Sequence, residues 1–445
     1  MNRPTPPAHP DDLTEQLVPL FLPCAAGVEA LLQAEVQALL GEQVRLKNAR
    51  GGVWVEGDAH TAMLLNLECR LAQRVLWPLA EGFYQHEQDL YDLARRVPWV
   101  QWITPAMTLR IDTTAQRSPL RSLNFATLRV KDAVCDALRE ATGERPSVDT
   151  RWPDLPLVLH LSPTEATLYA DTSGEALFKR GWREDKGEAP LKETLAAAML
   201  AAAGWQGRSE DGALLDPCCG AGTIVVEAAQ IACGIAPGLQ RRFAFEKMLP
   251  FRRHQAAWSR LKDAARARQH APAVAIHAGD VSFRMTDFAQ RNAERAGVSH
   301  AISFKTVDAL QRLPPAEQGL MLLNPPYGER IEPKGSRGDP RGVPRHAREG
   351  FGGAGDGAGG AGDAGPADFF ARLASHWKQH YAGWTAWVLS PDMKLSQSLR
   401  LKESRRVPMW NGPIECRLFR YDLVAGSARG DRPAAEPKAD QPPPG

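Results

Sequence analysis

Apolar and polar residues follow one another along the chain in two different patterns. In residues 17–170, short apolar stretches typical of strands are mixed with stretches whose apolar residues recur at helical spacing. The pattern predicts strands at 17–24, 51–57, 106–115 and 157–162, and helices at 27–40 and 125–143, the last ending at Gly143. Because helices and strands do not alternate strictly here, this part is predicted to be an α+β region.

Residues 171–424 alternate strand and helix. Strands are predicted at 213–216, 273–280, 302–308, 319–324 and 385–390, with helices at 190–204, 223–232, 287–297 and around 369–377. Pro190 is expected in the first turn of its helix, where the missing N–H costs nothing. The strands are apolar on both faces, which predicts an α/β fold with a parallel, doubly wound sheet. A last strand at 414–423 is expected to be antiparallel and at the edge.

Three segments lack either pattern. Residues 1–16 and 425–445 are rich in proline and polar residues, and residues 333–367 are rich in glycine. Such segments bury too little apolar surface to offset the entropy lost on ordering. We interpret them as two disordered tails and one flexible internal loop.

Composition excludes several classes of protein. No apolar run approaches the ~20 residues that span a bilayer, and the N-terminus lacks the order of a secretory signal, so a cytoplasmic protein without a membrane partner is expected. The seven cysteines show no C-x-x-C spacing, so neither a disulfide framework nor a metal site is indicated.

The net charge of +2 says little about partners, but one segment is strongly basic. Residues 241–268 hold nine Lys or Arg against Glu246 and Asp263. A solvated helical face is the commoner meaning of such a run. Contact with RNA through this segment, for example through Arg252 and Arg253, is the alternative hypothesis.

The strongest local feature is a glycine turn after a buried strand. The strand ends at Asp216, a short loop carries Gly220 and Gly222, and a helix follows from about Thr223. Glycines let a backbone approach a ligand at the carboxyl end of a strand, and a carboxylate there suits an ammonium group. The P-loop lysine and the third glycine of a dinucleotide fingerprint are both missing. The turn therefore favours S-adenosylmethionine over a nucleotide phosphate or a nicotinamide, with a ligand-free βα turn as the alternative.

Two more acidic residues follow the next strands. Asp280 could accept hydrogen bonds from ribose hydroxyls, and Asp308 could accept one from an adenine amino group. Either acid alone is more often a cap or a solvated charge. Three acids at three successive strand ends favour a nucleoside cofactor.

The tetrapeptide Asn324-Pro325-Pro326-Tyr327 follows a fully apolar strand directly. The Asn324 side-chain oxygen and the Pro325 carbonyl could hold the N–H groups of an exocyclic amine and free its lone pair for methylation. The prolines stiffen the turn, and Tyr327 could stack on an extruded base. A proline-rich surface turn is the alternative interpretation.

These motifs resemble a known family. DPCCGAGT and NPPY are similar to motifs I and IV of class I amino-methyltransferases. Residues 189–200, 171–183, 21–36 and 128–140 extend the resemblance to the bacterial 23S rRNA guanine-N2 methyltransferases, in which ferredoxin-like and THUMP regions precede the catalytic domain. The resemblance covers residues 17–424.

The resemblance implies a ferredoxin-like and THUMP RNA-binding region at 17–170 and a Rossmann-like methyltransferase domain at 171–424. It implies S-adenosylmethionine as cofactor and 23S rRNA or its precursor as partner. It places Asp216, Cys218, Gly220 and Gly222 at the methionine end, Lys192 and Glu193 beside the cofactor, Asp280 on ribose, Asp308 on adenine, and Asn324 to Tyr327 on the target amine. The segment after Asp280 lacks the second acid of many relatives, and the chain is expected to end before a second methyltransferase domain.

Three other functions stay open at this point. Adenine-N6 methylation of DNA or RNA uses the same tetrapeptide chemistry. Methylation of a glutamine amide in a protein would leave the first domain unexplained. A non-catalytic RNA-binding factor of ribosome assembly would bind RNA without methyl transfer.

Overall fold

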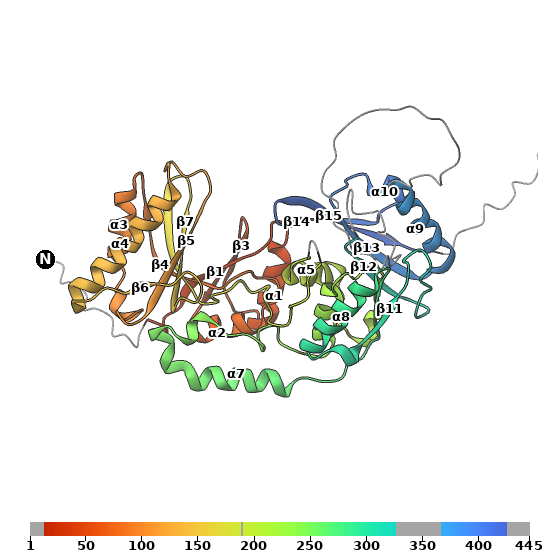
Figure 1. The fold of residues 1–445 in the computed structure, drawn as a ribbon, viewed down its shortest axis with the longest axis horizontal. Coiled ribbons are helices and arrows are strands. Elements are labelled where there is room, and N and C mark those ends of the chain that lie inside the picture. Colours follow the sequence, from red (N-terminus) through yellow and green to blue (C-terminus); the bar gives the residue numbers. More distant parts are fainter. Residues whose placement is uncertain (1–12, 188–189, 326–365, 425–445) are drawn as a thin grey trace, which may run out of the picture.

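The computed structural model describes residues 13–187, 190–325 and 366–424. Figure 1 shows two sheets placed one after the other along the long axis, with helix α7 running beneath helix α2. The predicted tails and glycine-rich loop lie almost wholly outside the described residues. Residues 13–16 are described: Thr14 is buried, and its hydroxyl lies 2.9 Å from the ring of His254.

The first sheet has eight strands in the order β2-β3-β1-β4-β8-β7-β5-β6. Its pairs are antiparallel except for those of β5 with β6 and β7. The strands are β1 Val18–Pro23, β2 Leu46–Ala49, β3 Gly52–Gly57, β4 Leu76–Phe83, β5 Thr108–Ala115, β6 Ser147–Val148, β7 Leu155–Leu161 and β8 Glu165–Asp171. The helices are α1 Glu29–Leu40, α2 Ala59–Glu68, α3 Glu87–Arg95 and α4 Leu123–Thr142. The predicted α+β region is confirmed.

Four strands and two helices of this region were not predicted, and their sequences explain why. Strand β4 contains Pro78 and an irregularity between Pro78 and Ala80, and most of its residues beyond Trp77 are partly exposed. Helix α2 is buried on nearly every side, so it has no polar stripe to reveal its period. Helix α4 ends as predicted, because Gly143 takes the left-handed conformation with φ 85°.

The second sheet has seven strands in the order β11-β10-β9-β12-β13-β15-β14, and the first five are parallel. The strands are β9 Ala213–Asp216, β10 Ile276–Asp280, β11 Ile302–Thr306, β12 Gly319–Leu323, β13 Trp384–Ser390, β14 Arg405–Asn411 and β15 Ile414–Asp422. The helices are α5 Glu193–Ala203, α6 Thr223–Ala232, α7 Gln255–Ala267, α8 Phe283–Arg295, α9 Pro366–His380 and α10 Leu395–Leu399. The predicted doubly wound sheet is confirmed, with its switch point between β9 and β12.

Two details of the prediction for this sheet are wrong. Strand β15 is antiparallel as expected, but it pairs with both β13 and β14, so β14 is the edge strand. Strand β14 was not predicted because it contains arginines and Pro408, and proline within a run argues against a strand. Helix α5 begins at Glu193 rather than at Pro190, because the backbone of Lys192 is extended and caps the helix.

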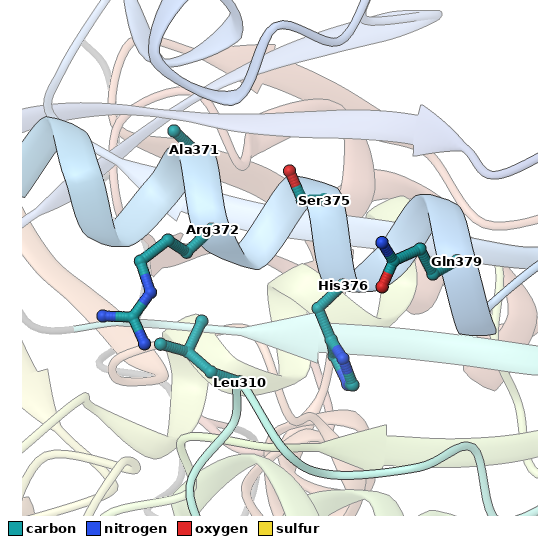
Figure 2. A pocket seen from close by; sticks show the side chains of 6 residues that line it. All are labelled: Leu310, Ala371, Arg372, Ser375, His376 and Gln379. Atoms are coloured by element: carbon teal, nitrogen blue, oxygen red, sulfur yellow. The ribbon is translucent and has the colours of Figure 1, made fainter.

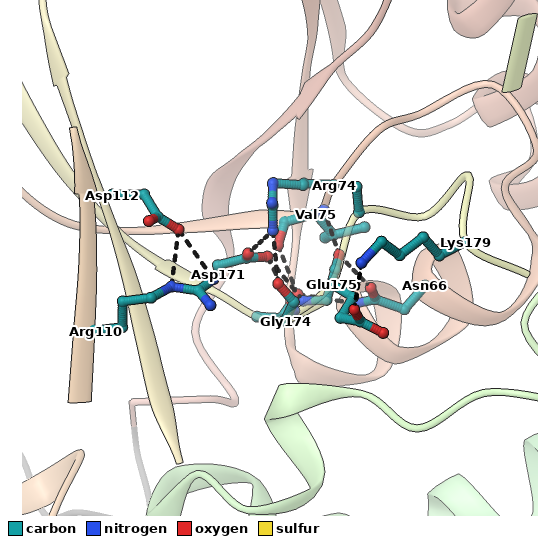
Figure 3. A network of polar contacts seen from close by, with 12 residues as sticks. Asn66, Arg74, Val75, Arg110, Asp112, Asp171, Gly174, Glu175 and Lys179 are labelled. Carbon is teal, nitrogen blue, oxygen red and sulfur yellow. Dashed lines mark hydrogen bonds and ion pairs between the residues drawn. The ribbon is translucent and has the colours of Figure 1, made fainter. Parts of the chain in front are cut away.

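The segment that leaves the first sheet is fixed by buried polar contacts (Figure 3). The carboxylate of Asp171, at the end of β8, pairs with Arg74 and accepts the backbone N–H groups of Ser173 and Gly174 at 3.1 and 3.2 Å. The Ser173 hydroxyl donates to the side-chain oxygen of Asn66 in α2 at 2.6 Å. The chain therefore enters the second domain along a fixed path.

A second cluster joins the first domain to helix α6. The fully buried carboxylate of Glu227 accepts from the Nε of Arg180 at 3.0 Å and from the Nη1 of Arg70 at 3.3 Å. Arg180 also donates to the backbone carbonyl of Arg70 at 2.7 Å. The ion cluster therefore joins the first domain to the helix that follows the candidate cofactor loop.

Candidate active site

The predicted site residues lie at the carboxyl edge of the second sheet. Asp216 ends β9 and Asp280 ends β10, and these two strands are paired with Asp216 beside Ala278. On the other side of β9, strand β12 ends one residue before Asn324. Asp308 follows β11 by two residues at the same edge. The fold therefore brings to one edge four residues that are up to 108 positions apart in the sequence.

Asp216 is a buried carboxylate at this edge, with 1% of its surface exposed. It accepts a hydrogen bond from the backbone N–H of Cys218 at 3.1 Å. Burial raises the pKa of Asp216 well above its usual range, and the nearby charge of Asp280 adds to the shift. A cationic group bound beside it would favour the ionised form.

Asp280 supports the glycine turn. One of its carboxylate oxygens accepts the backbone N–H of Gly220 at 2.9 Å, and the other accepts that of Ser282 at 2.9 Å. Burial raises the pKa of Asp280, while these two hydrogen bonds lower it. Each oxygen keeps a further acceptor site, so the expected contact with ribose stays a prediction.

The two predicted glycines have different roles in the structure. Gly220 has φ 53°, and a Cβ added to it would meet no atom within 4 Å, so the loop faces open space there. Gly222 has φ 86°, and its Cβ would come within 2.9 Å of the Cβ of Ala289 in α8. Gly220 leaves room for a ligand, whereas Gly222 permits the close packing of α6 on α8.

The thiol of Cys218 lies among the acidic residues. Burial raises its pKa well above the usual range, and the charges of Asp216, Asp280 and Asp308 raise it further. The charges of all three predicted carboxylates therefore act on this thiol at the start of the glycine turn. The thiol stays protonated in that field.

Arg183 is a residue of this region to which the sequence analysis gave no role. Its Nε donates to the buried carboxylate of Glu193 at 2.6 Å, and its Nη2 donates to the hydroxyl of Thr223 at 2.7 Å. It thus ties the first residue of α5 to the first residue of α6. Glu193 is buried, and a buried carboxylate needs a cationic partner, but the sequence alone does not show that Glu193 is buried.

Lys192 precedes α5, and its side chain lies near an aromatic ring and a cavity. Its ammonium lies 5.2 Å from the ring centre of Phe178, and the residue lines a cavity of about 200 Å³ that also borders the first domain. Its expected place beside the cofactor stays a prediction.

Asp308 begins a loop that packs against α9. Its carboxylate accepts the backbone N–H of Leu310 at 2.9 Å. Figure 2 shows Leu310 facing Arg372 and His376 of α9 across an open hollow of about 370 Å³. His376 is held by the carbonyl of Arg312 at 2.7 Å.

Two of the four residues of the predicted catalytic tetrapeptide are described. Asn324 is half-buried and Pro325 is buried, and both follow β12 directly. Pro326 and Tyr327 lie outside the described residues. The roles of all four stay predictions.

Much of the charge in the basic segment serves the fold. Arg241 donates to four backbone carbonyls, and Lys247, Arg253 and Arg268 pair with Asp154, Glu15 and Glu68. Arg252 is exposed. The hypothesis of RNA contact therefore rests on fewer cations than the sequence suggested.

The sheet order, the glycine turn and the acidic strand ends define a class I, Rossmann-like methyltransferase fold. Along the chain, the RlmL ferredoxin-like domain family matches residues 19–76, the THUMP domain family matches 84–171, and the RMKL-like methyltransferase domain family matches 180–339. The chain therefore has THUMP and RlmL-like methyltransferase domains, which confirms the resemblance found in the sequence.

Known proteins of similar sequence and structure agree with this assignment. The "Ribosomal RNA large subunit methyltransferase K/L" of Psychromonas ingrahamii is 35% identical over 94% of this chain and 51% of its own length. The chain thus spans about half the length of the curated relatives it matches.

Two solved structures are similar over nearly their whole length. The putative methyltransferase SMU.472, complexed with SAH, is 23% identical over 92% of this chain and 98% of its own, with a TM-score of 0.76. A predicted N6-adenine-specific DNA methylase from Listeria monocytogenes is 25% identical over 92% of this chain and 96% of its own, with a TM-score of 0.74. Among the described residues, the search for a helix long and apolar enough to cross a bilayer finds none.

Proposed function

We propose that this protein transfers a methyl group from S-adenosylmethionine to the exocyclic N2 amine of a guanine in 23S rRNA. The observation that carries the proposal is the meeting of two motifs at neighbouring strand ends. The glycine turn follows β9, Asn324 follows β12, and these two strands are paired in parallel. The relatives named as large-subunit rRNA methyltransferases support the substrate, and with it a cytoplasmic site of action.

The residues present suit S-adenosylmethionine. The buried Asp216, with its raised pKa, would hold the ammonium of the methionine part, and the open space at Gly220 would admit the ligand to the backbone. Asp280 would fix the turn while its remaining lone pairs take ribose hydroxyls. Cys218 and Gly222 border the methionine end, Glu193 and Lys192 lie in the neighbouring helix start, and Asp308 takes the adenine.

When bound, S-adenosylmethionine supplies an electrophilic methyl group on a sulfonium. The protein's part is to make the target amine nucleophilic and to aim it. Asn324 and Pro325 would accept hydrogen bonds from the two amine N–H groups, Pro326 would restrict the backbone after them, and Tyr327 would stack on the base. The amine nitrogen would form the new bond to the methyl carbon as the bond from that carbon to sulfur breaks and the neutral thioether leaves, and the nitrogen would then lose one proton to solvent, so no general base is required.

The first domain would bind the RNA. The THUMP match supports this role, and the buried cluster of Glu227 with Arg70 and Arg180 supports a fixed orientation between that domain and the cofactor loop. RNA held by the first domain would then reach the site at a defined distance. Exposed Arg252, before α7, is a further candidate contact with RNA.

Adenine-N6 methylation is the second candidate. The Listeria protein whose structure the chain resembles is a predicted N6-adenine-specific DNA methylase, and the asparagine–proline acceptors suit either amine. The two candidates differ in product, not in site geometry.

The test uses the full chain with S-adenosylmethionine carrying a labelled methyl group. Protein-free 23S rRNA from a strain lacking the gene is the substrate, and nucleosides are analysed by mass spectrometry. N2-methylguanosine is the expected product. N6-methyladenosine would support the second candidate, and tight RNA binding without transfer would support a non-catalytic factor.

A further inference from the structure

The cavity of about 200 Å³ beside Lys192 lies where four parts of the chain meet. Its walls come from the segment after β1, from Gln73 before β4, from the start of α5, and from the end of β14 with the turn that follows it. The lining residues are Cys24, Ala25, Ala26, Gln73, Lys192, Thr194, Leu195, Trp410, Asn411 and Gly412. Cavities between domains are frequent ligand sites. None of these residues except Lys192 belongs to the site described above.

The fold places this cavity at the carboxyl edge of the second sheet, where the proposed reaction occurs. Through Arg183, the start of α5 is tied to the start of α6, directly after the glycine turn. Strand β15 runs antiparallel to β13, with Arg417 opposite Ser390, so its first residues and the preceding turn lie beyond the carboxyl end of β13. RNA that reaches Asn324 would pass this edge.

The walls of the cavity are held by close contacts between the domains. Gly27 packs so tightly on β14 that an added Cβ would lie 2.3 Å from the carbonyl oxygen of Pro408. The Glu29 carboxylate accepts the backbone N–H groups of Gly27 and Gly51 at 2.8 and 3.0 Å. The wall formed by residues 24–26 is therefore set before any ligand binds, which lowers the entropic cost of binding.

The lining chemistry suits a single nucleobase. Trp410 offers an aromatic ring, and the guanidinium of Arg417 lies 5.7 Å from the centre of that ring. Gln73 and Asn411 provide carboxamides, which pair with the hydrogen-bonding edge of a base, and Lys192 provides a cation for a phosphate. The volume is below the ~300–1,000 Å³ usual for a whole drug-sized ligand, so it suits one planar ring.

The charges near the cavity do not oppose a nucleotide. Glu29 has both of its carboxylate oxygens occupied by backbone N–H groups. Glu415, opposite Trp410, pairs with Arg417 at 2.6 Å. Burial, with the Glu29 charge, raises the pKa of Cys24 to about 12, so its thiol is neutral at physiological pH. The lining therefore presents one cation and neutral groups.

We propose that this cavity binds one unpaired base of the RNA substrate, close in sequence to the methylated nucleotide. This inference rests on the proposed function and deepens it. The site would read a neighbouring nucleotide by stacking on Trp410 and hydrogen bonding to Asn411 and Gln73. It would thereby help to choose the target among the exposed guanines of a large RNA.

The test measures RNA binding and methylation by the full chain with the same protein-free 23S rRNA. Trp410→Ala and Asn411→Ala are compared with Trp410→Phe, which keeps a stacking face, and with His300→Ala, an exposed residue before β11 at the opposite edge. Loss of a base stack costs roughly 5- to 150-fold in affinity. We expect KM for RNA to rise by about 10-fold or more in Trp410→Ala and less in Trp410→Phe, with the Kd for S-adenosylmethionine unchanged.

Several outcomes separate this proposal from the proposed function. If the wild type methylates the RNA and Trp410→Ala and Asn411→Ala both match its KM, the cavity proposal alone is overturned. If the variants lose cofactor affinity or thermal stability in proportion to RNA affinity, the cavity is structural and the proposal is also overturned. If the wild type binds this RNA without methylating it and Trp410→Ala weakens binding, the cavity proposal holds and the proposed function fails.

Discussion

The carboxylate of Asp280, at the end of β10, accepts the backbone N–H of Gly220 in the loop after β9 at 2.9 Å. One acidic residue thus shapes the glycine turn of the neighbouring strand. The turn is fixed by a side chain 60 positions away in the sequence, and not by its own glycines alone.

Asp280→Ala is expected to lower the affinity for S-adenosylmethionine by about 10-fold or more, because the turn loses a charge-assisted hydrogen bond and the ribose loses an acceptor. Titration calorimetry measures the change. Asp287→Ala in α8, where the acid is half exposed and pairs with Arg291, is the matched control and keeps the wild-type Kd. An unchanged Kd for S-adenosylmethionine in Asp280→Ala would show that this acid does not take part in cofactor binding.

The affinity for S-adenosylmethionine is expected to rise with pH. The raised pKa of Asp216 means that the free protein holds a proton there at pH values above the ordinary pKa of about 3.9. Binding of an ammonium group favours the ionised form, so a proton is released on binding and affinity increases as pH rises toward the raised pKa. Calorimetry in buffers of different ionisation enthalpy measures the released proton. Asp216→Asn should bind weakly and release none, and equal proton release by this variant would contradict the assignment.

Asn324→Ala is expected to lower kcat by about 100-fold or more, because the target amine loses the acceptor that aims it. The Kd for S-adenosylmethionine should stay near normal. Single-turnover methylation of 23S rRNA separates the chemical step from binding. Wild-type kcat in this variant would be incompatible with the proposed mechanism.

Glu227→Ala is expected to destabilise the protein by about 3–5 kcal/mol, because Arg70 and Arg180 would be left buried without their carboxylate. Urea unfolding measures the loss. Lys179→Ala removes a surface pair with Glu175, in which both side chains are about half exposed, and should change the midpoint little. Equal midpoints for the two variants would show that the buried cluster adds nothing to stability.

Arg252→Glu is expected to reduce the dependence of RNA binding on salt. Each lost phosphate contact lowers the slope of log affinity against log salt concentration by about 0.7–0.9. Arg252 is a cleaner probe than Arg253, which pairs with Glu15. Arg208→Glu, an exposed residue before β9, is the control. Identical slopes for Arg252→Glu and wild type would leave the basic segment with a structural role only.

The sequence predicted the elements whose periodicity is visible locally. Helix α6 was predicted with its observed bounds, and α4 ends at Gly143 as expected, because glycine turns and amphipathic stripes are local signals. Strand β14 was not predicted, because its Pro408 and arginines are not typical of a strand, and the strand forms by pairing with β15.

The sequence predicted which residues lie at the site, but not the contacts that these residues make. The acids at strand ends could be found because parallel strands share one carboxyl edge. The contact of Asp280 with Gly220, the packing of Gly222 on Ala289 and the link of Arg183 to Glu193 and Thr223 could not be found. Each depends on which helices cross above the sheet, and local patterns do not contain that information.

The sequence by itself determined the class of fold and the chemistry available at its strand ends. The order of the strands, the buried cluster around Glu227 and the cavity between the domains were decided only by the tertiary structure. The physical reason is that periodicity and turn residues act over a few positions. Ion pairs and cavities instead arise between residues that only the folded chain brings together.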